Sequence, residues 1–201
     1  MREIRAILSG CGEILSLKEA GLTAEAEENG KTFLENAEIK AREIHEKLKK
    51  TLPAGATLPI VLADDSGLCV DALGGAPGVY SARWLGHETP YSEKNKVLIE
   101  KLSGLSGKAR AAQFVCNICA VLPDGSVLHT EGVMRGEIAE SPAGCGGFGF
   151  DPVFLLPEYG VTSAELSAEK KNEISHRGKA LRAMKAELEK QCESRQQGLY
   201  V

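Results

Sequence analysis

The chain has 201 residues, of which 43% are hydrophobic and 26% charged, a composition typical of a globular protein with a sizeable core. Its formal net charge of −4 argues against the basic face that nucleic-acid binding requires, although a local cluster of cations could still hold a nucleotide. No apolar run approaches the roughly 20 residues that cross a bilayer. We therefore expect neither nucleic-acid nor membrane partners.

Six cysteines are scattered along the chain without the spacing of a disulfide framework. Cys116 and Cys119 form a CxxC motif inside the apolar run FVCNICAVL, where their odd spacing predicts opposite faces of a strand. A zinc site would need a second pair of ligands nearby, and the sequence offers none. Buried reduced thiols are the better interpretation, and with the absence of a signal-peptide pattern they indicate a cytoplasmic protein.

The first third of the chain predicts two helices and two strands. Residues 2–9 have the apolar periodicity of a helix, and residues 13–17 read as a short strand. Thr32-x-x-Glu35 is a capping box, and it opens a helix that continues to about residue 50. After a Pro/Gly loop, residues 59–63 predict a short buried strand that ends at Asp64-Asp65-Ser66-Gly67.

The rest of the chain continues the alternation of helices and strands. The remaining predicted elements are a helix over 92–102, strands over 111–122, 126–132, 133–140 and 150–156, and a helix over 168–191 with a break near Ser175. Pro-Asp-Gly joins the first two of these strands in a hairpin. Because helices and strands interleave without a linker, we expect a single α/β domain over 1–201 with a mixed sheet.

Three segments could carry chemistry. In Asp64-Asp65-Ser66-Gly67, two carboxylates at the end of a buried strand suit a hard metal and the orientation of water, or else a turn in which Asp and Ser cap backbone donors. In the glycine-rich run 144–152, Phe148 could stack on a flat ligand, or Phe148 and Phe150 could both pack inside a bulged strand.

The third segment is KNEISHRG, residues 171–178. Ser175 can cap a new helix whose first residues are His176 and Arg177. Donors then converge at a positive helix end, which suits phosphate oxygens or a carbonyl. The alternative is a basic helix start that only faces solvent.

Together these segments identify a family. ADDSGLCVDALGGAPGVYSARW, GGFGFDPVF and EKKNEISHRGKAL, with ENGKTFLENAEIKA upstream, closely resemble the inosine/xanthosine triphosphate pyrophosphatases. The similarity runs in order from about Met1 to Leu188. It implies an elongated α/β fold with a mixed β-sheet and flanking helices, two lobes around a central cleft, and a homodimer. The implied reaction converts a non-canonical purine nucleoside triphosphate (ITP, dITP or XTP) and water into the monophosphate and pyrophosphate, with Mg²⁺.

The resemblance also implies residue roles. Asp65 would bind metal and act as general base, and the second metal ligand would be Glu28, with Glu35 as the rival that the capping box already explains. The implied substrate-binding residues are Ser66, Phe148, Gly149, Phe150, Asp151, Lys171, His176 and Arg177. Phe148 would stack on the purine, while His176 and Arg177 would donate to the C6 carbonyl that adenine lacks. Donors left without a partner would reject adenine.

The resemblance departs from the family at the start. Family members open with a hydrophobic strand and a Thr/Ser-x-Asn-x-x-Lys loop, whereas Met1 to Ile4 already align with the helix that follows. We therefore expect a chain that is incomplete at its N-terminus and turns over weakly. The alternatives are a catalytically impaired nucleotide-binding protein that lacks the phosphate loop, and a nucleotide-sugar transferase that uses Asp64 and Asp65 on a metal.

Overall fold

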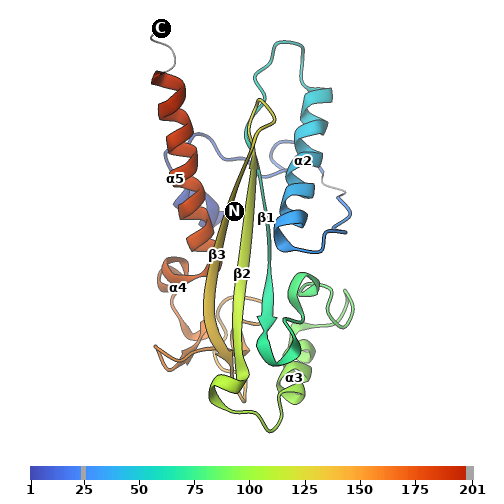
Figure 1. Cartoon of the computed structure of the whole chain (residues 1–201), viewed down its shortest axis with the longest axis vertical. Coiled ribbons are helices and arrows are strands. Elements are labelled where there is room, and N and C mark those ends of the chain that lie inside the picture. Colours follow the sequence, from blue (N-terminus) through green and yellow to red (C-terminus); the bar gives the residue numbers. More distant parts are fainter. Residues whose placement is uncertain (24–25, 198–201) are drawn as a thin grey trace. The chain divides into compact units, whose positions relative to one another are not determined.

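A computed structural model of the chain describes residues 1–23 and 26–197. Within these residues the strands form one five-stranded sheet in the order β1-β2-β3-β4-β5 (Figure 1). The strands are β1 (Val61–Val70), β2 (Ala111–Val121), β3 (Val127–Ile138), β4 (Phe154–Leu156) and β5 (Val161–Thr162). The α-helices are α1 (Arg2–Ile7), α2 (Phe33–Thr51), α3 (Tyr91–Lys101), α4 (Ala168–Ile174) and α5 (His176–Gln197). The predicted α/β class, a sheet with flanking helices, is confirmed.

The chain divides into two compact units that interleave in sequence. Unit 1 contains Met1–Asp65, Cys116–Gly132 and the chain from Arg177 onward, and unit 2 contains Ser66–Val115 and Val133–His176. Each of β1, β2 and β3 therefore contributes residues to both units. β4 pairs antiparallel with β3 on one side and with β5 on the other.

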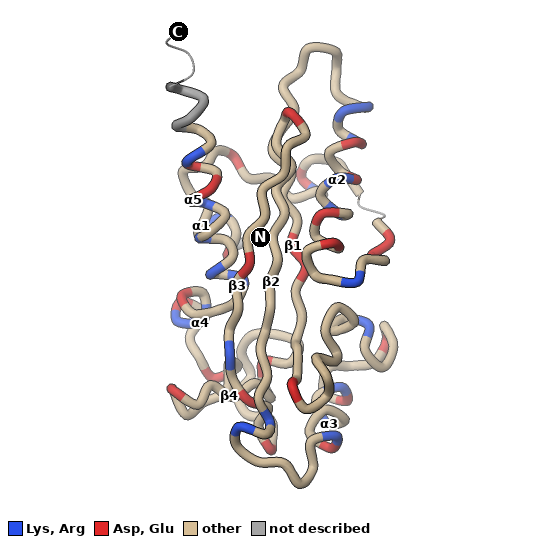
Figure 2. Tube along the Cα trace, viewed as in Figure 1, with Lys and Arg blue, Asp and Glu red and all other residues tan. Residues whose placement is uncertain are grey.

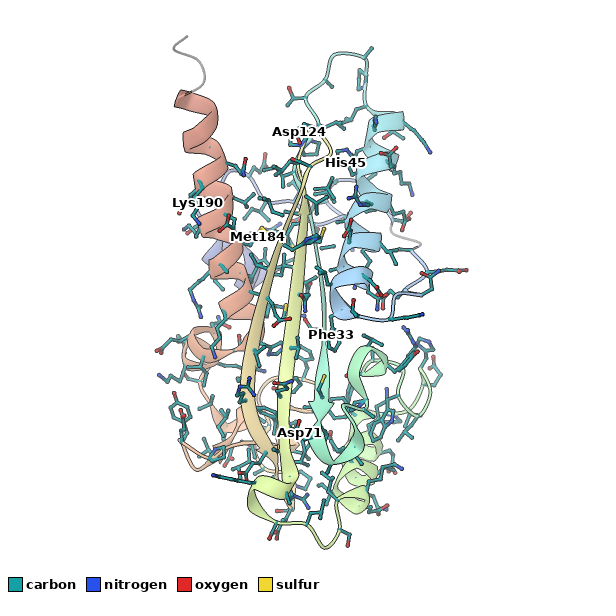
Figure 3. The ribbon with its side chains drawn as sticks, viewed as in Figure 1. Phe33, His45, Asp71, Asp124, Met184 and Lys190 are labelled. Atoms are coloured by element: carbon teal, nitrogen blue, oxygen red, sulfur yellow. The ribbon has the colours of Figure 1, made fainter. Side chains whose placement is uncertain are left out.

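In unit 1, helices cover both faces of the sheet. One buried cluster packs α5 and the α1 region against β2: Leu8, Cys116, Ile118, Ala120, Leu122, Ala180, Leu181, Met184 and Leu188. The other packs α2 against β1 and β2: Ala37, Ala41, Ile44, Val61, Cys119 and Val121. Met184 points from α5 toward the sheet and Lys190 points away (Figure 3). Cys116 and Cys119 lie on opposite faces, as the strand period predicted.

Unit 2 has a core of its own around the ends of three strands. Its buried members are Leu68, Val70, Leu98, Leu102, Ala112, Phe114, Met134, Ile138, Phe150, Val153, Phe154 and Leu156. α3 contributes Leu98 from a face that also buries Lys94 and Asn95. The helix thus places two polar side chains against an apolar core, which costs free energy unless each finds a partner.

Local signals located the helix ends. The Thr32 side chain accepts from the Glu35 backbone N–H at 3.1 Å, and the Glu35 carboxylate accepts from the Thr32 N–H at 3.1 Å. The predicted capping box is confirmed, and a cap of this kind stabilises a helix by about 1 kcal/mol. The predicted break near Ser175 is also confirmed, because Ser175 is extended (φ −64°, ψ 154°) between α4 and α5.

Three strand predictions were wrong. β1 does not end at residue 63 but runs to Val70, so Asp64 and Asp65 lie within the strand rather than in a turn after it. The two strands expected over 126–132 and 133–140 are the single strand β3. Residues 13–17 form no strand. Instead, Arg5 Nε donates to the Ile14 carbonyl at 3.1 Å, and the Ser16 N–H donates to the Glu19 carboxylate at 2.8 Å.

The segment before β4 also differs from the prediction. Asp151–Val153 is a 3₁₀ turn, so β4 begins at Phe154 rather than at residue 150.

Among the described residues, no helix combines the length and apolar character needed to cross a bilayer.

Candidate functional site

The two adjacent aspartates of β1 bind different cations in unit 1. Asp65 accepts a hydrogen bond from Lys40, and Asp64 accepts from Arg177. Neighbouring side chains in a strand point to opposite faces, and the two carboxylates accordingly have separate partners. Asp65 is the more enclosed of the two, with a side chain 12% exposed against 26% for Asp64.

We call Asp65, Glu28, Lys40 and Asn36 the carboxylate cluster. The Lys40 Nζ lies 3.0 Å from Asp65 Oδ1 and 3.1 Å from Glu28 Oε1, so two carboxylates share one ammonium. Asn36 is fully buried; its Nδ2 donates to Asp65 Oδ2 at 3.2 Å, and its Oδ1 accepts from the Gly30 N–H at 2.9 Å. Both oxygens of Asp65 are therefore held by residues of α2.

α2 places these side chains together because Asn36 and Lys40 are four residues apart and so share a face of the helix. Along the helix, Lys and Arg positions are interspersed with Glu (Figure 2). The sequence interpretation gave Lys40 and Asn36 no role in the site. The signal that could have found them is their spacing in ENAEIK, directly after the acidic loop that contains Glu28.

For both Asp65 and Lys40, burial and the neighbouring charges shift the pKa in opposite directions. Burial raises the pKa of Asp65, and the hydrogen bonds from Lys40 and Asn36 offset only part of that effect. Burial alone would lower the pKa of Lys40, but the attraction of Asp65 and Glu28 outweighs it and raises that pKa. The ammonium therefore stays charged between the two carboxylates.

Glu28 and Glu35, the two candidates for the second metal ligand, make different contacts. Glu35 closes the capping box through its carboxylate, whereas Glu28 shares the Lys40 ammonium with Asp65. Within residues 1–23 and 26–197, no group of three or more His, Cys, Asp or Glu could hold a metal by itself. Among the described residues, the cluster thus brings two carboxylates to one point.

Asp64 and Arg177 form an ion pair with two hydrogen bonds. The Nε and Nη2 atoms of Arg177 donate to Asp64 Oδ2 at 3.0 Å and 2.8 Å. Burial alone would lower the pKa of Arg177, but the carboxylate of Asp64 outweighs it and raises that pKa. The Cys116 thiol lies 4.0 Å from the same oxygen. Asp64 thus orients Arg177, the residue that the resemblance assigns to the base carbonyl.

Unit 2 contains the glycine-rich segment, and we call residues 147–151 the aromatic loop. Phe148 and Phe150 differ sharply, because the Phe148 side chain is 67% exposed while Phe150 is 3% exposed in the core. Gly149 between them has φ 68°, a left-handed conformation that glycine adopts without strain. Phe148 is available to a ligand, and Phe150 supports the loop.

Asp151 organises the aromatic loop from a buried position. Its Oδ2 accepts from the Phe148 N–H at 2.7 Å and from Lys171 Nζ, and its Oδ1 accepts from Ser163 Oγ at 2.9 Å. A Cβ at Gly147 would overlap Asp151 Oδ2, so only glycine fits there. The Lys171 ammonium also lies 5.3 Å from the centre of the Phe148 ring. Asp151 therefore positions both the exposed ring and a cation beside it.

His176 begins α5 and is buried in unit 2. Its ring stacks on Phe114 with centroids 4.9 Å apart and planes 14° apart, which fixes the orientation of the imidazole. Ser66 lies in β1 and is partly buried. The unit boundary falls within two of the predicted segments, because Asp65 and Arg177 belong to unit 1 while Ser66 and His176 belong to unit 2.

Comparison with known proteins identifies relatives over nearly the whole chain. The Ham1 family profile matches residues 1–187. A dITP/XTP pyrophosphatase of Clostridium perfringens is 47% identical over 189 residues, covering 94% of this chain and 91% of that protein. One of Bacillus licheniformis is 44% identical over 190 residues, covering 94% and 92%. The solved Ham1 protein of Staphylococcus aureus matches with a TM-score of 0.83 at 36% identity, covering 94% of this chain and 93% of that one.

Proposed function

The chain belongs to the Ham1 family, and from this membership we propose that it hydrolyses non-canonical purine nucleoside triphosphates such as ITP, dITP and XTP. The products are the nucleoside monophosphate and pyrophosphate. Relatives that match along 94% of the chain are named pyrophosphatases, which favours a working enzyme over a nucleotide-binding protein without catalysis. The observation that carries the proposal is the convergence of Asp65 and Glu28 on one cationic point, the Lys40 ammonium.

The same geometry suits Mg²⁺, which we propose as the cofactor. Mg²⁺ prefers oxygen ligands, and it is usually bound by one or two carboxylates together with substrate phosphates and water. The cluster supplies two carboxylate oxygens that already converge on one cation. Asp65 and Glu28 would hold the metal. The metal would neutralise negative charge on the substrate phosphates.

Asp65 is the candidate general base. Water attacks the phosphorus next to the nucleoside, pyrophosphate leaves, and the water proton goes to the base. The Asp65 carboxylate is partly buried, and Asn36 and Lys40 hold its two oxygens. Lys40 is the cation of this cluster that could turn toward phosphate oxygens once a metal neutralises the carboxylates.

Base recognition falls to residues that are fixed by their neighbours. Phe148 presents an exposed ring for stacking on a purine, and Lys171 is anchored beside it by Asp151. The buried His176 ring and the guanidinium of Arg177, oriented by Asp64, are the proposed donors to the C6 carbonyl. Ser66 and Gly149 are proposed as further contacts with the substrate.

We also propose a homodimer in the cytoplasm. All six cysteines lie among the described residues and none forms a disulfide, which supports a reducing compartment. The dimer rests on the family resemblance, and light scattering on the purified chain would measure it directly.

The experiment is pyrophosphate release from ITP and from ATP at saturating Mg²⁺, for the natural chain and for Asp65→Asn. We expect release from ITP to exceed release from ATP, and Asp65→Asn to lower kcat by about 10²–10⁴-fold, the usual contribution of a general base. The melting temperature should fall as well, because asparagine keeps the shape of Asp65 but removes one charge of a largely buried ion pair, so both rates are measured well below the two unfolding transitions.

The matched control is Asp124→Asn in the β2–β3 turn. An asparagine there can still accept from the Ser126 N–H, which Asp124 does at 2.9 Å, so turnover should stay at the natural level. If Asp65→Asn retained natural turnover, or if ITP released no more pyrophosphate than ATP, the proposed function would be wrong.

A further inference from the structure

α3 holds the aromatic loop through one asparagine. Asn95 is 5% exposed, and its Nδ2 donates to the Gly149 carbonyl at 3.2 Å. The orientation of this amide is determined, because a carbonyl can only accept and the nitrogen must face it. Asn95 thus contacts the backbone directly after the exposed Phe148 ring.

Two neighbours of Asn95 complete this face of α3. The Tyr91 ring meets Phe150 edge to face, with centroids 5.3 Å apart and planes at 89°, and it lies under Gly149, where an added Cβ would be 3.5 Å from Tyr91 Cε1. The Lys94 Nζ lies 4.8 Å from the centre of the Tyr91 ring and donates to the Ala82 carbonyl at 2.6 Å. Lys94 is 1% exposed, so the ring is fixed by a buried cation.

Packing alone does not explain an asparagine at this position. Its Oδ1 is buried and has no hydrogen-bond partner among the described residues. A buried acceptor of this kind loses its hydrogen bonds to water and forms none in the protein. Leucine has the same size and no polar atom to desolvate. What leucine could not supply is the donor to Gly149.

The loop is sensitive to that donor because of its backbone. Gly147 and Gly149, on either side of Phe148, have φ of 72° and 68°, and glycine can leave such conformations as easily as it adopts them. Two hydrogen bonds fix the backbone here. After Gly147, the Phe148 N–H donates to Asp151, and at Gly149 the backbone carbonyl accepts from Asn95. Without Asn95, the Gly149 carbonyl loses this hydrogen bond, and the backbone after Phe148 is less restrained.

We propose that Asn95 is a positioning residue for base recognition: it fixes the Gly149 carbonyl, and through it the angle at which the Phe148 ring meets the purine. This inference rests on the proposed function, because it takes the ligand of Phe148 to be a purine base. Asn95 does not touch the reacting atoms, so it should act on affinity for the base and leave the chemical step unchanged.

The test replaces the amide with an apolar side chain of the same size, Asn95→Leu. Two measurements need no catalysis: amide hydrogen exchange over residues 147–151, and titration with inosine monophosphate (IMP) followed by the fluorescence of Trp84. Trp84 is the sole tryptophan, and its ring centroid is 6.1 Å from that of Phe150. The third measurement is KM and kcat for ITP.

We expect Asn95→Leu to speed exchange over 147–151 without ligand and to raise Kd for IMP about 5-fold, the effect of losing one hydrogen bond. KM for ITP should rise similarly while kcat changes by less than about 2-fold. The matched control is Asn117→Leu, since Asn117 is also a buried asparagine that donates at 3.2 Å, to Glu131. It should change neither loop exchange nor IMP affinity.

Unchanged loop exchange in Asn95→Leu, or faster exchange with unchanged Kd for IMP, would overturn the inference. A fall in kcat with unchanged KM would also overturn it. If Asn95→Leu does not fold, Asn95→Ser gives the same test, because the serine side chain is too short for its hydroxyl to reach the Gly149 carbonyl. A natural chain that binds IMP but releases no pyrophosphate from ITP would refute the proposed hydrolysis and leave this inference standing. A chain that hydrolyses ITP, and in which Asn95→Leu leaves KM for ITP unchanged, would refute this inference alone.

Discussion

Breaking the Asp64–Arg177 ion pair should cost about 2 kcal/mol of stability. Exposed ion pairs contribute about 0.2–1 kcal/mol, whereas removing one partner of a fully buried pair costs about 3–5 kcal/mol. This pair lies between those limits, because its side chains are 26% and 25% exposed. Two hydrogen bonds of 2.8 Å and 3.0 Å end on the same carboxylate oxygen, and hydrogen bonds to charged groups are the stronger kind.

The measurement is a double-mutant cycle with Asp64→Asn, Arg177→Met and the double variant, each unfolded in urea. Methionine retains the aliphatic length of arginine and so preserves most of its packing. The cycle isolates the coupling between the two residues from the other effects of each change. A coupling below about 0.5 kcal/mol would show that the pair behaves as an exposed one and would refute this reasoning.

The same variants connect the ion pair to recognition of the base. If Arg177 donates to the C6 carbonyl only when Asp64 orients it, Asp64→Asn should erode the preference for ITP over ATP as Arg177→Met does. Because both variants affect recognition of the purine, each should reduce the maximal rate with ITP less than Asp65→Asn does. Equal losses with ITP and ATP in Arg177→Met would instead move Arg177 from base reading to phosphate binding.

Two further pairs of variants test neighbouring residues with different expected roles. Phe148→Ala should weaken IMP binding by about 1–3 kcal/mol through lost stacking and leave the melting temperature unchanged, whereas Phe150→Ala should destabilise the fold by about 3–5 kcal/mol. Isothermal titration and urea unfolding measure the two effects, and a stability loss in Phe148→Ala would contradict the assignment. Glu28→Gln should raise the Mg²⁺ concentration required for half-maximal turnover, while Glu35→Ala, which removes the acceptor of the capping box, should lower stability by about 1 kcal/mol without changing that requirement. The reverse pattern would identify Glu35 as the metal ligand.

The features that the sequence predicted well are those made by residues close together in the chain. The capping box at Thr32 and Glu35, the Pro-Asp-Gly turn and the break at Ser175 each involve a few consecutive positions, and all three are confirmed. The strands were predicted less well, because a strand needs a partner that the local pattern does not reveal. Residues 13–17 have strand-like composition, but the side chain of Arg5 binds there in place of a neighbouring strand.

The aromatic loop shows why a motif could not be resolved from its pattern. In a strand, Phe148 and Phe150 would share a face, so the sequence left open whether Phe148 stacks on a ligand or packs with Phe150 in the core. The left-handed conformation of Gly149 turns the backbone between them and separates the two rings. Phe150 therefore packs in the core and Phe148 does not, while stacking of Phe148 on a ligand stays a prediction.

The candidate catalytic cluster was found only in part, for a related reason. Asp65 is visible in the sequence as half of a carboxylate pair, but its partners Asn36 and Lys40 lie 29 and 25 residues earlier. They reach it because α2 begins at a defined residue, and that residue is set by the capping box. Moving the helix start by one position would rotate this face by about 100° and carry both side chains away from Asp65. The capping box at first explained Glu35 as purely structural, but it also determines which residues of α2 face the proposed general base.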